Sequence, residues 1–459
     1  MELTHEVAKF IVGKGFHDFS REEIQAAKDL ILDGIGAMIG GARERATAIT
    51  IQYARDTGGT EECGILGGGL KTSLLNAALS NGTSSHSQEL ESIGLYTGSN
   101  PMTNIPVALN VGEKFNLSGK AVIEGTIIGL EVQTKLGMGG PGSFDRGFSS
   151  IPLYGSMGAT ASAGKMMKMS VEQLQNALGI AIAQSSGQQR QQGSMTHLLE
   201  AGLACRNGVT AAMLARGGMT ADPALIEGER GFYDLFCSGG RGYNQEGVVP
   251  GLGNPFCVAG VFIKKYGCCF FNHRAMDALV QLMEEHKIRF DDVTGVEAEI
   301  PPFVANMLRF PEPQNGEDAK FSLHQSLGSI LIDGKVDLPY VRPFGDAGAV
   351  DPRYQEARKK IKVIERKDWA GGRSAPWSTP VTIFLKDGRK YTRAVDANEL
   401  KGGLKNPLSR DELAGRYRAM TQGFLSSPQI DRSIELVSSL ENLDSIAELM
   451  KLATFGMSK

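Results

Sequence analysis

A histidine followed closely by two carboxylates is the first group in this sequence that is suited to acid–base chemistry. His86 precedes Glu89 by three residues and Glu91 by five, and a polar loop then runs to Asn100-Pro101. In a helix, His86 and Glu89 would lie one turn apart on the same face. Because histidine titrates near neutral pH, the pair suits proton transfer or substrate positioning. The alternative is a capped helix end with a solvated pair of glutamates.

Other acid–base groups stand alone in the chain. His197 lies in the run SMTHLLEAG, and Lys264 and Lys265 directly precede Tyr266. A histidine, or a lysine removed from water, can abstract a proton next to a carboxylate or a carbonyl group. Taken singly, each also fits a plainer role, as a hydrogen-bonded histidine or a surface lysine.

The common motifs of cofactor and metal chemistry are missing. The sequence has no Walker loop, no GxGxxG after a strand, no GxSxG elbow, no HExxH and no CxxC pair. Among its six cysteines, Cys268 and Cys269 are adjacent, and this spacing favours reduced thiols over a disulfide. We therefore expect neither a metal ion nor an organic cofactor.

The composition is that of an ordinary soluble protein. The 459 residues are 41% hydrophobic and 22% charged, with a net charge of −3, so there is no electrostatic reason to expect nucleic acid or an anionic membrane as a partner. The first ten residues lack the basic start and apolar run of a targeting segment. The apolar helical stretches are too short to span a membrane. We expect a cytoplasmic protein.

Helical patterns fill the first half of the chain. Ser20 and Glu23 form a capping box before an apolar stripe that ends at Gly40-Gly41. Further helices are expected over residues 70–79, 106–113, 122–136, 155–168, 170–185 and 199–216, with a long Gly/Pro/Ser loop over 138–152 and no strand pair. The sequence predicts a large all-helical domain over residues 1–255.

Strand patterns begin after Asn254-Pro255. Apolar and polar residues alternate around 296–300, 361–363 and 381–385, and Asp387-Gly388 marks a two-residue hairpin turn. Helical patterns occur among these strands, at 273–286 and at 321–332. The chain is therefore expected to be mainly α, with a smaller α+β domain over 256–398 inserted before C-terminal helices over 399–459. Ser409 and Glu412 cap these helices, which we expect to return to the first domain.

Several segments together resemble one family. They are ALSNGTSSHSQELES, IIGLEVQTKLG, GSMTHLLEAGLACRNGVTAAMLARGGMT, EGERGF, IKKYGCCFFNHRAMDAL, AKFSLHQSLGSILIDG and LKDGRKYTRAV to KNPLSRDEL. By their order and spacing the chain resembles the 2-methylcitrate dehydratase (MmgE/PrpD) family, which includes cis-aconitate decarboxylase and iminodisuccinate epimerase. The resemblance implies a homodimer that acts on small carboxylates without a metal or cofactor, at a site between the two domains.

The resemblance carries some acid–base residues over and replaces others. The family's NGTxxH histidine corresponds to His86, its first aspartate to Glu89, and the acidic position that follows to Glu91. The lysine of the KxYxCC-like segment is kept as Lys264, and the lysine after Met-Thr is replaced by His197. We expect His197 and Lys264 to transfer the proton and His86 to complete the catalytic set.

Further positions that the resemblance marks as substrate-binding have changed residue type. The family's His-Pro histidine is replaced by Asn100, a loop histidine by Ser149 and a histidine three residues after His197 by Glu200. The set expected to bind substrate is therefore Glu89, Asn100, Ser149, Glu200, His273 and Gln325, of which Gln325 stands for a tyrosine. The site loses positive charge, so we expect a substrate with fewer carboxylates than a tricarboxylate, or one with an amine or neutral group that Glu200 binds.

Four readings of the function follow. The first is a dehydratase-like lyase that removes a proton α to a carboxylate without a cofactor. The second is an epimerase or isomerase of a small dicarboxylate, which needs proton transfer to and from carbon only and therefore tolerates the loss of the histidine at Asn100 better. Decarboxylation ranks below these two. The alternative outside enzymes is a family member that no longer catalyses a reaction and instead binds a ligand or has a structural role.

Overall fold

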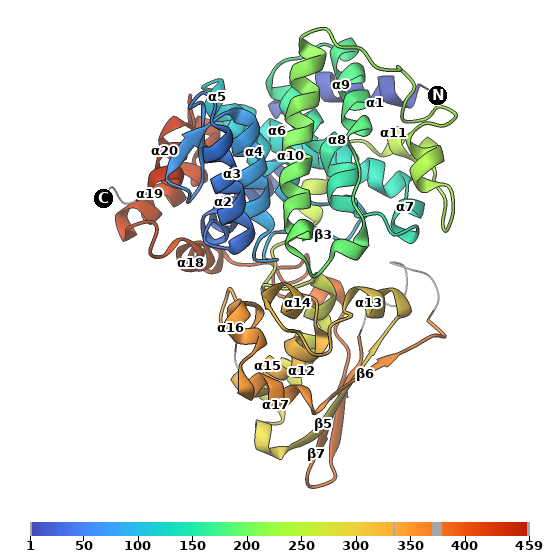
Figure 1. Ribbon diagram of the computed structural model, residues 1–459, viewed down its shortest axis with the longest axis vertical. Helices are drawn as coiled ribbons and strands as arrows, with labels where there is room; N and C mark the ends of the chain where they lie inside the picture. Colours follow the sequence, from blue (N-terminus) through green and yellow to red (C-terminus); the bar gives the residue numbers. More distant parts are fainter. Residues whose placement is uncertain (1, 335, 370–378, 457–459) are drawn as a thin grey trace.

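The chain forms a large body of helices and a smaller body that contains a sheet (Figure 1). The computed structural model describes residues 2–334, 336–369 and 379–456. The helical lobe is built from the N-terminal half together with the last helices, and the sheet lobe lies below it in the view of Figure 1. The protein is thus mainly α with a smaller α+β portion, as the sequence predicts. The boundaries at 255 and 398 stay predictions.

Long buried helices make up the helical lobe. In chain order they are α1 (Leu3–Gly13), α2 (Arg21–Gly41), α3 (Arg45–Thr57), α4 (Leu74–His86), α5 (Ile105–Lys114), α6 (Gly119–Gly139), α8 (Ser150–Met166), α9 (Val171–Ala183) and α10 (Met195–Arg216). The capping box predicted at Ser20 and Glu23 is present at the start of α2, and Ser170 with Gln173 caps α9 in the same way. These helices enclose one large apolar core.

The close approach of α4 to α10 brings together acid–base side chains from the two helices. Gly82 on α4 faces Gly202 on α10, and a Cβ atom on Gly202 would lie 2.2 Å from the Leu79 carbonyl oxygen. Only glycine permits this contact between backbones. The packing brings the last residue of α4, His86, close to the first turn of α10, which carries His197.

Two local predictions in this lobe are wrong. Residues 70–72 form strand β2 (Leu70–Thr72), which pairs antiparallel with β1 (Cys63–Ile65), so α4 begins only at Leu74 and continues to His86. The loop expected over 138–152 contains a short helix, α7 (Gly142–Asp145), and the first turn of α8. A three-residue strand offers too little alternation to be recognised in a sequence.

A four-stranded sheet organises the sheet lobe. Its strands are β5 (Val293–Ile300), β6 (Ile361–Glu365), β7 (Val381–Leu385) and β8 (Lys390–Arg393), in the order β6-β5-β7-β8. β5 runs parallel to β6 and antiparallel to β7, and β7 and β8 form the predicted hairpin, with Thr382 opposite Thr392. Helices α12 (Phe270–Glu285) and α15 (Leu323–Asp333) share the apolar core of the sheet.

Short elements complete the two lobes. They include β3 (Ile93–Gly94), which pairs with β4 (Val261–Phe262), the helices α11 (Val248–Gly251), α13 (Pro302–Met307), α14 (Gly316–Lys320), α16 (Asp346–Ala349) and α17 (Pro352–Arg358), and the 3-10 turns η2 (Pro101–Thr103) and η3 (Gln189–Gln191).

The last helices lie beside the first ones. Helix α18 (Arg410–Thr421) carries the predicted capping box of Ser409 and Glu412 and packs against α2, followed by α19 (Ser427–Ser438) and α20 (Ala447–Phe455). In Figure 1 these red helices lie next to the blue N-terminal ones. Within the described residues, no helix has both the length and the apolar character needed to cross a membrane.

Candidate active site

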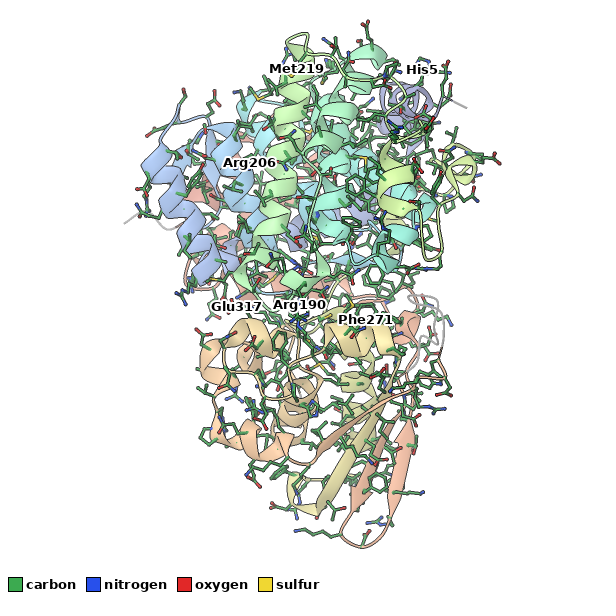
Figure 2. The ribbon with its side chains drawn as sticks, turned by 45° about the vertical axis from the view of Figure 1, so that its right-hand side comes forward. His5, Arg190, Arg206, Met219, Phe271 and Glu317 are labelled. Carbon is green, nitrogen blue, oxygen red and sulfur yellow. The ribbon has the colours of Figure 1, made fainter. Side chains whose placement is uncertain are left out.

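A small cavity of about 70 Å³ lies where the two lobes meet. Figure 2 labels Phe271, one of the residues that line it, at this junction. The polar lining comes from His86, Glu89, Glu91, Asn100, Ser149, Ser150, Gln189, Gln192, His197 and Lys264, and the apolar lining includes Met102, Phe144, Phe270, Phe271, Met307 and Phe321. Both lobes therefore contribute to one site.

The end of α4 carries the residues with which the sequence analysis began. The helix stops at His86, and Glu89 follows in a tight turn in which its amide donates to the His86 carbonyl oxygen at 3.0 Å. Glu89 has a φ of +51°, a left-handed conformation that non-glycine residues seldom adopt. Backbone strain of this kind is concentrated at functional sites. The turn keeps Glu89 within reach of His86, as the predicted helix would have done.

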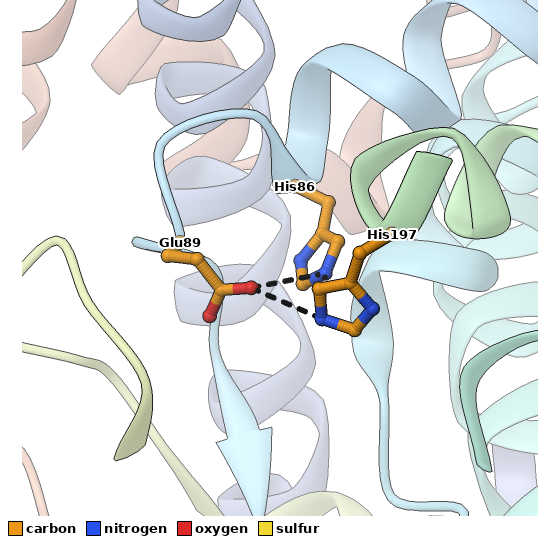
Figure 3. A group of neighbouring side chains, drawn as sticks. All are labelled: His86, Glu89 and His197. Carbon is orange, nitrogen blue, oxygen red and sulfur yellow. Dashed lines mark hydrogen bonds and ion pairs between the residues drawn. The ribbon is translucent and has the colours of Figure 1, made fainter. Parts of the chain in front are cut away.

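Three side chains from α4, its turn and α10 converge on one point (Figure 3). The Nε2 atom of His86 lies 3.2 Å from Glu89 Oε1, and the Nε2 atom of His197 lies 3.3 Å from the same oxygen. The two Nε2 atoms are themselves 3.3 Å apart. All three side chains are buried, with at most 5% of any residue exposed.

Each ring also has a carboxylate on its other nitrogen. Nδ1 of His86 lies 3.1 Å from Glu91 Oε2, and Nδ1 of His197 lies 3.1 Å from Glu200 Oε2. The Phe321 ring packs edge-on against His197, with centroids 5.4 Å apart. These contacts hold both rings in one orientation.

The side chains of His86, Glu89, Glu91, His197 and Glu200 form one cluster. Lys264, which follows shortly after β4, joins this cluster from the side of the sheet lobe. Its ammonium group donates to the Glu89 carbonyl oxygen at 3.0 Å and to Glu89 Oε2 at 3.1 Å, and it also contacts Glu91 Oε1. The residue is only 2% exposed. A single lysine is thus shared by two buried carboxylates.

The electrostatics favour the charged form of each of these partners. Burial by itself raises the pKa of the Glu89 carboxyl, but the nearby Lys264, His86 and His197 outweigh burial and hold the pKa well below its usual value. Burial by itself lowers the pKa of His197, yet its contacts with Glu200 and Glu89 raise the pKa to about 9. Burial likewise opposes the ammonium form of Lys264, but Glu91 and Glu89 raise its pKa above the ordinary lysine value. At neutral pH His197 and Lys264 therefore carry protons beside an ionised Glu89.

Besides Glu89, two of the predicted substrate-binding residues line the cavity, and a further one lies behind the lining. The Asn100 amide donates to Ser150 Oγ at 3.4 Å, and Ser149 Oγ donates to Glu200 Oε2 at 2.8 Å. Glu200 does not line the cavity itself and reaches it through its contacts with Ser149 and His197.

The other two predicted residues, His273 and Gln325, lie outside this cavity. The His273 ring is hydrogen bonded to the Cys268 carbonyl oxygen, and burial together with the charge of Lys264 lowers its pKa to about 3. The Gln325 amide donates to the carbonyl oxygens of Pro343 and Gly348, and so ties loops of the sheet lobe together. The substrate-binding role of both residues stays a prediction.

Two residues outside the predicted set prove central to the geometry. Glu91 contacts both His86 and Lys264, and its place two residues after Glu89 was a usable signal. Arg416 on α18 is fully buried and donates to Asp33 Oδ1, to the Lys264 carbonyl oxygen and to the Leu90 carbonyl oxygen at 2.6–2.7 Å. Nothing in the local sequence marks Arg416, because its partners lie far away along the chain.

The cluster also contains residue types that bind metal ions. Within the described part of the chain, one ligand atom each of His86, Glu89 and His197 lies within 4.8 Å of the other two, so these three residues could also hold a metal ion.

Comparisons with known proteins agree with this architecture. Residues 5–244 match the model of the MmgE/PrpD N-terminal domain, and residues 266–442 match that of the MmgE/PrpD C-terminal domain. Cis-aconitate decarboxylase of Aspergillus terreus is 25% identical, over 98% of this chain and 95% of its own length. The Homo sapiens and Mus musculus proteins of the same name are each 23% identical, over 98% of this chain and 94% and 93% of their own lengths.

Proposed function

Because this chain belongs to the MmgE/PrpD family, we propose that it is a lyase for a small carboxylate and that it moves a proton at the carbon next to the carboxylate group. The relatives named cis-aconitate decarboxylase support a lyase of this broad type. At 25% identity or less they do not supply the substrate.

One observation carries the proposal: two buried groups that hold protons, His197 and Lys264, flank the ionised Glu89 on a cavity lined from both lobes. A cation next to a substrate carboxylate stabilises the negative charge that develops when the neighbouring carbon loses its proton. A protonated group also serves as the general acid in the second half of the reaction. In a dehydration, the ionised Glu89 carboxylate takes the proton from the α-carbon, the electron pair of the broken C–H bond forms the double bond, and the hydroxyl group leaves as water with a proton from His197 or Lys264.

A second candidate, epimerisation or isomerisation, is favoured by Asn100. This residue lines the cavity where the family resemblance places a histidine, and its amide is hydrogen bonded to Ser150. An amide does not transfer protons near neutral pH, so a reaction that needs one proton acceptor and one proton donor on carbon, and no further acid for a leaving group, suits the site.

The test follows the α-proton directly. The full chain is incubated in deuterated buffer with small hydroxy-, unsaturated and amino-dicarboxylates, and exchange is followed by NMR. We expect exchange with at least one compound and its loss in Lys264→Ala and His197→Ala. Lys265→Ala is the matched control, since Lys265 is the neighbouring lysine, pairs with Asp277 instead and does not line the cavity.

The products of the same incubations separate the candidates. Release of water with a new double bond identifies a dehydratase, release of carbon dioxide a decarboxylase, and inversion without loss of mass an epimerase. A stably folded protein that exchanges no proton in any compound contradicts the proposal and favours a binding role.

The charge of the cluster also limits how many carboxylates a substrate can carry. Glu89, Glu91 and Glu200 lie within one hydrogen-bonded network that contains a single lysine. A ligand with three carboxylates adds negative charge to this network, so we expect citrate-like tricarboxylates to bind weakly in isothermal titration. Micromolar affinity for citrate would contradict this expectation.

A further inference from the structure

Apolar side chains make up a large part of the cavity wall. Phe144 lies on α7, Phe270 and Phe271 begin α12, and Met307 ends α13. All four are at most 9% exposed and belong to the apolar core that also contains the sheet. The rings of Phe144 and Phe271 both pack edge-on against Phe303, with centroids 6.5 and 5.4 Å apart. The core therefore fixes the position of these side chains along the cavity.

A second apolar surface lines the cavity from the helical lobe. Met102 and Ile151 form a small buried cluster with Ala201, which is separate from the core that contains the sheet. The cavity thus lies between two apolar clusters. Water finds few hydrogen-bond partners against such surfaces, so an apolar group of a ligand is favoured there over water.

The polar lining offers positive charge for one carboxylate. Lys264 is the only lysine among the described residues of the lining, and none of them is an arginine. Together with the protonated ring of His197, it can contact one substrate carboxylate. The neutral Gln189 amide is already hydrogen bonded to the carbonyl oxygens of Phe144 and Phe148. A second carboxylate would therefore be buried without a cation beside it, which is unfavourable.

The volume of the cavity limits the size of the ligand. About 10–15 Å³ of such space holds one water molecule, so the 70 Å³ present here accommodate about five to seven groups of that size. A monocarboxylate of about four or five carbon atoms has about six or seven non-hydrogen atoms, whereas a citrate-like tricarboxylate has about twice as many. The size and the charge of the cavity thus agree on a short acid.

We propose that the preferred substrate is a monocarboxylate of about four or five carbon atoms with an apolar tail that lies against Phe144, Phe271 and Met307. Its carboxylate lies beside His197 and Lys264, as in the proposed function, on which this inference rests. The tail takes the place of the further carboxylates that a tricarboxylate carries. An amine does not suit this place, because Glu200, which would bind it, does not line the cavity.

Binding is measured first, with saturated acids that do not react. The full chain is titrated with propanoate, butanoate, pentanoate and longer acids, and with succinate as a dicarboxylate of similar length, by calorimetry and ligand-observed NMR. Each added methylene is expected to tighten binding about 4-fold as far as pentanoate, and longer acids are expected to gain nothing further. Pentanoate is expected to bind about 10-fold more tightly than succinate, or better. Equal or tighter binding of succinate, or an affinity that does not rise with chain length, would overturn the proposal.

The exchange assay separates this inference from the proposed function. Hydroxy and unsaturated monocarboxylates of the same lengths are added to the incubations in deuterated buffer, and their α-protons are expected to exchange faster than those of dicarboxylates. Exchange confined to dicarboxylates contradicts the inference and leaves the proposed function intact. Binding of the monocarboxylates without exchange in any acid contradicts the proposed function and leaves the place of the apolar tail intact.

Variants of Met307 locate the tail. Met307→Gln keeps the length of the side chain and makes its end polar, so it is expected to remove the gain in affinity of about 4-fold from butanoate to pentanoate. Met307→Leu, which keeps an apolar side chain, should retain that gain. Met213→Gln is the control, because Met213 lies on α10 and is 41% exposed. Thermal melting confirms that each variant is folded. An undiminished gain in folded Met307→Gln, or its loss in Met213→Gln, contradicts the placement of the tail.

Discussion

The two walls of the cavity differ in kind. The wall from the helical lobe carries both histidines and all three glutamates of the cluster, at the end of α4 and the start of α10. The opposite wall contributes Lys264 and an apolar surface that includes Phe270, Phe271 and Phe321. The helical wall therefore holds most of the ionisable groups, while the other wall supplies one cation and excludes water, which strengthens the interactions of that cation.

Removing the one cation from the second wall should have the largest effect. In Lys264→Met, Glu89 and Glu91 lose the ammonium group that they share, so we expect the free energy of unfolding to fall by about 3–5 kcal/mol. Urea unfolding measures the change. Lys359→Met, in which a lysine with a 72% exposed side chain is altered, should stay within about 0.5 kcal/mol. An equal loss in both variants would contradict the special role of the lysine in the second wall.

Removing one ring from the helical wall should give a pH-dependent effect. The pKa of His197 is raised from 6.5 to about 9, so its protonation stabilises the fold fully below pH 6.5, and this stabilisation is lost as the pH rises through 9. We therefore expect the difference in stability between the wild type and His197→Gln to shrink by about 3 kcal/mol between these limits, as measured by urea unfolding at a series of pH values.

The control for this effect is His17→Gln, which removes a histidine whose side chain is 86% exposed and which is remote in sequence from the cluster. A difference between wild type and His197→Gln that stays constant from pH 6 to 9.5 would mean that Glu200 and Glu89 do not hold the proton on His197.

The residue that joins the walls should have a smaller effect on stability. Arg416 donates to the carbonyl oxygens of Lys264 and Leu90 at once, and lysine cannot reproduce this fork. Arg416→Lys is expected to cost about 2 kcal/mol in the free energy of unfolding. If the NMR assay detects exchange of the α-proton of a substrate, Arg416→Lys should also lower the rate of that exchange, since Lys264 loses its fixed position. Arg418→Lys on the exposed side of α18 is the control, and a loss as large as that of Arg416→Lys would contradict this role.

Local patterns identified most elements correctly because the relevant forces act within a few residues. Ser20 and Glu23 satisfy the first amides of α2 whatever lies around them, and Asp387-Gly388 turns the chain between β7 and β8. The errors fall where neighbours in space decide. Residues 70–72 are a strand because they pair with Cys63–Ile65, and a helix would have been equally consistent with their side chains alone.

The candidate site was likewise predicted in part from the sequence, and the rest depended on the tertiary structure. The sequence alone singled out His86, Glu89, His197 and Lys264 by residue type and by the family resemblance, and it determined the mainly α fold through helical periodicity and capping. Only the tertiary structure decided that Lys264 is shared by Glu89 and Glu91, that His273 and Gln325 lie outside the cavity, and that two histidines meet one carboxylate oxygen. The physical reason is that ion pairs and ligand sets depend on distances of about 3 Å between atoms, and packing, here the glycine contact of α4 with α10, sets those distances for residues more than a hundred positions apart.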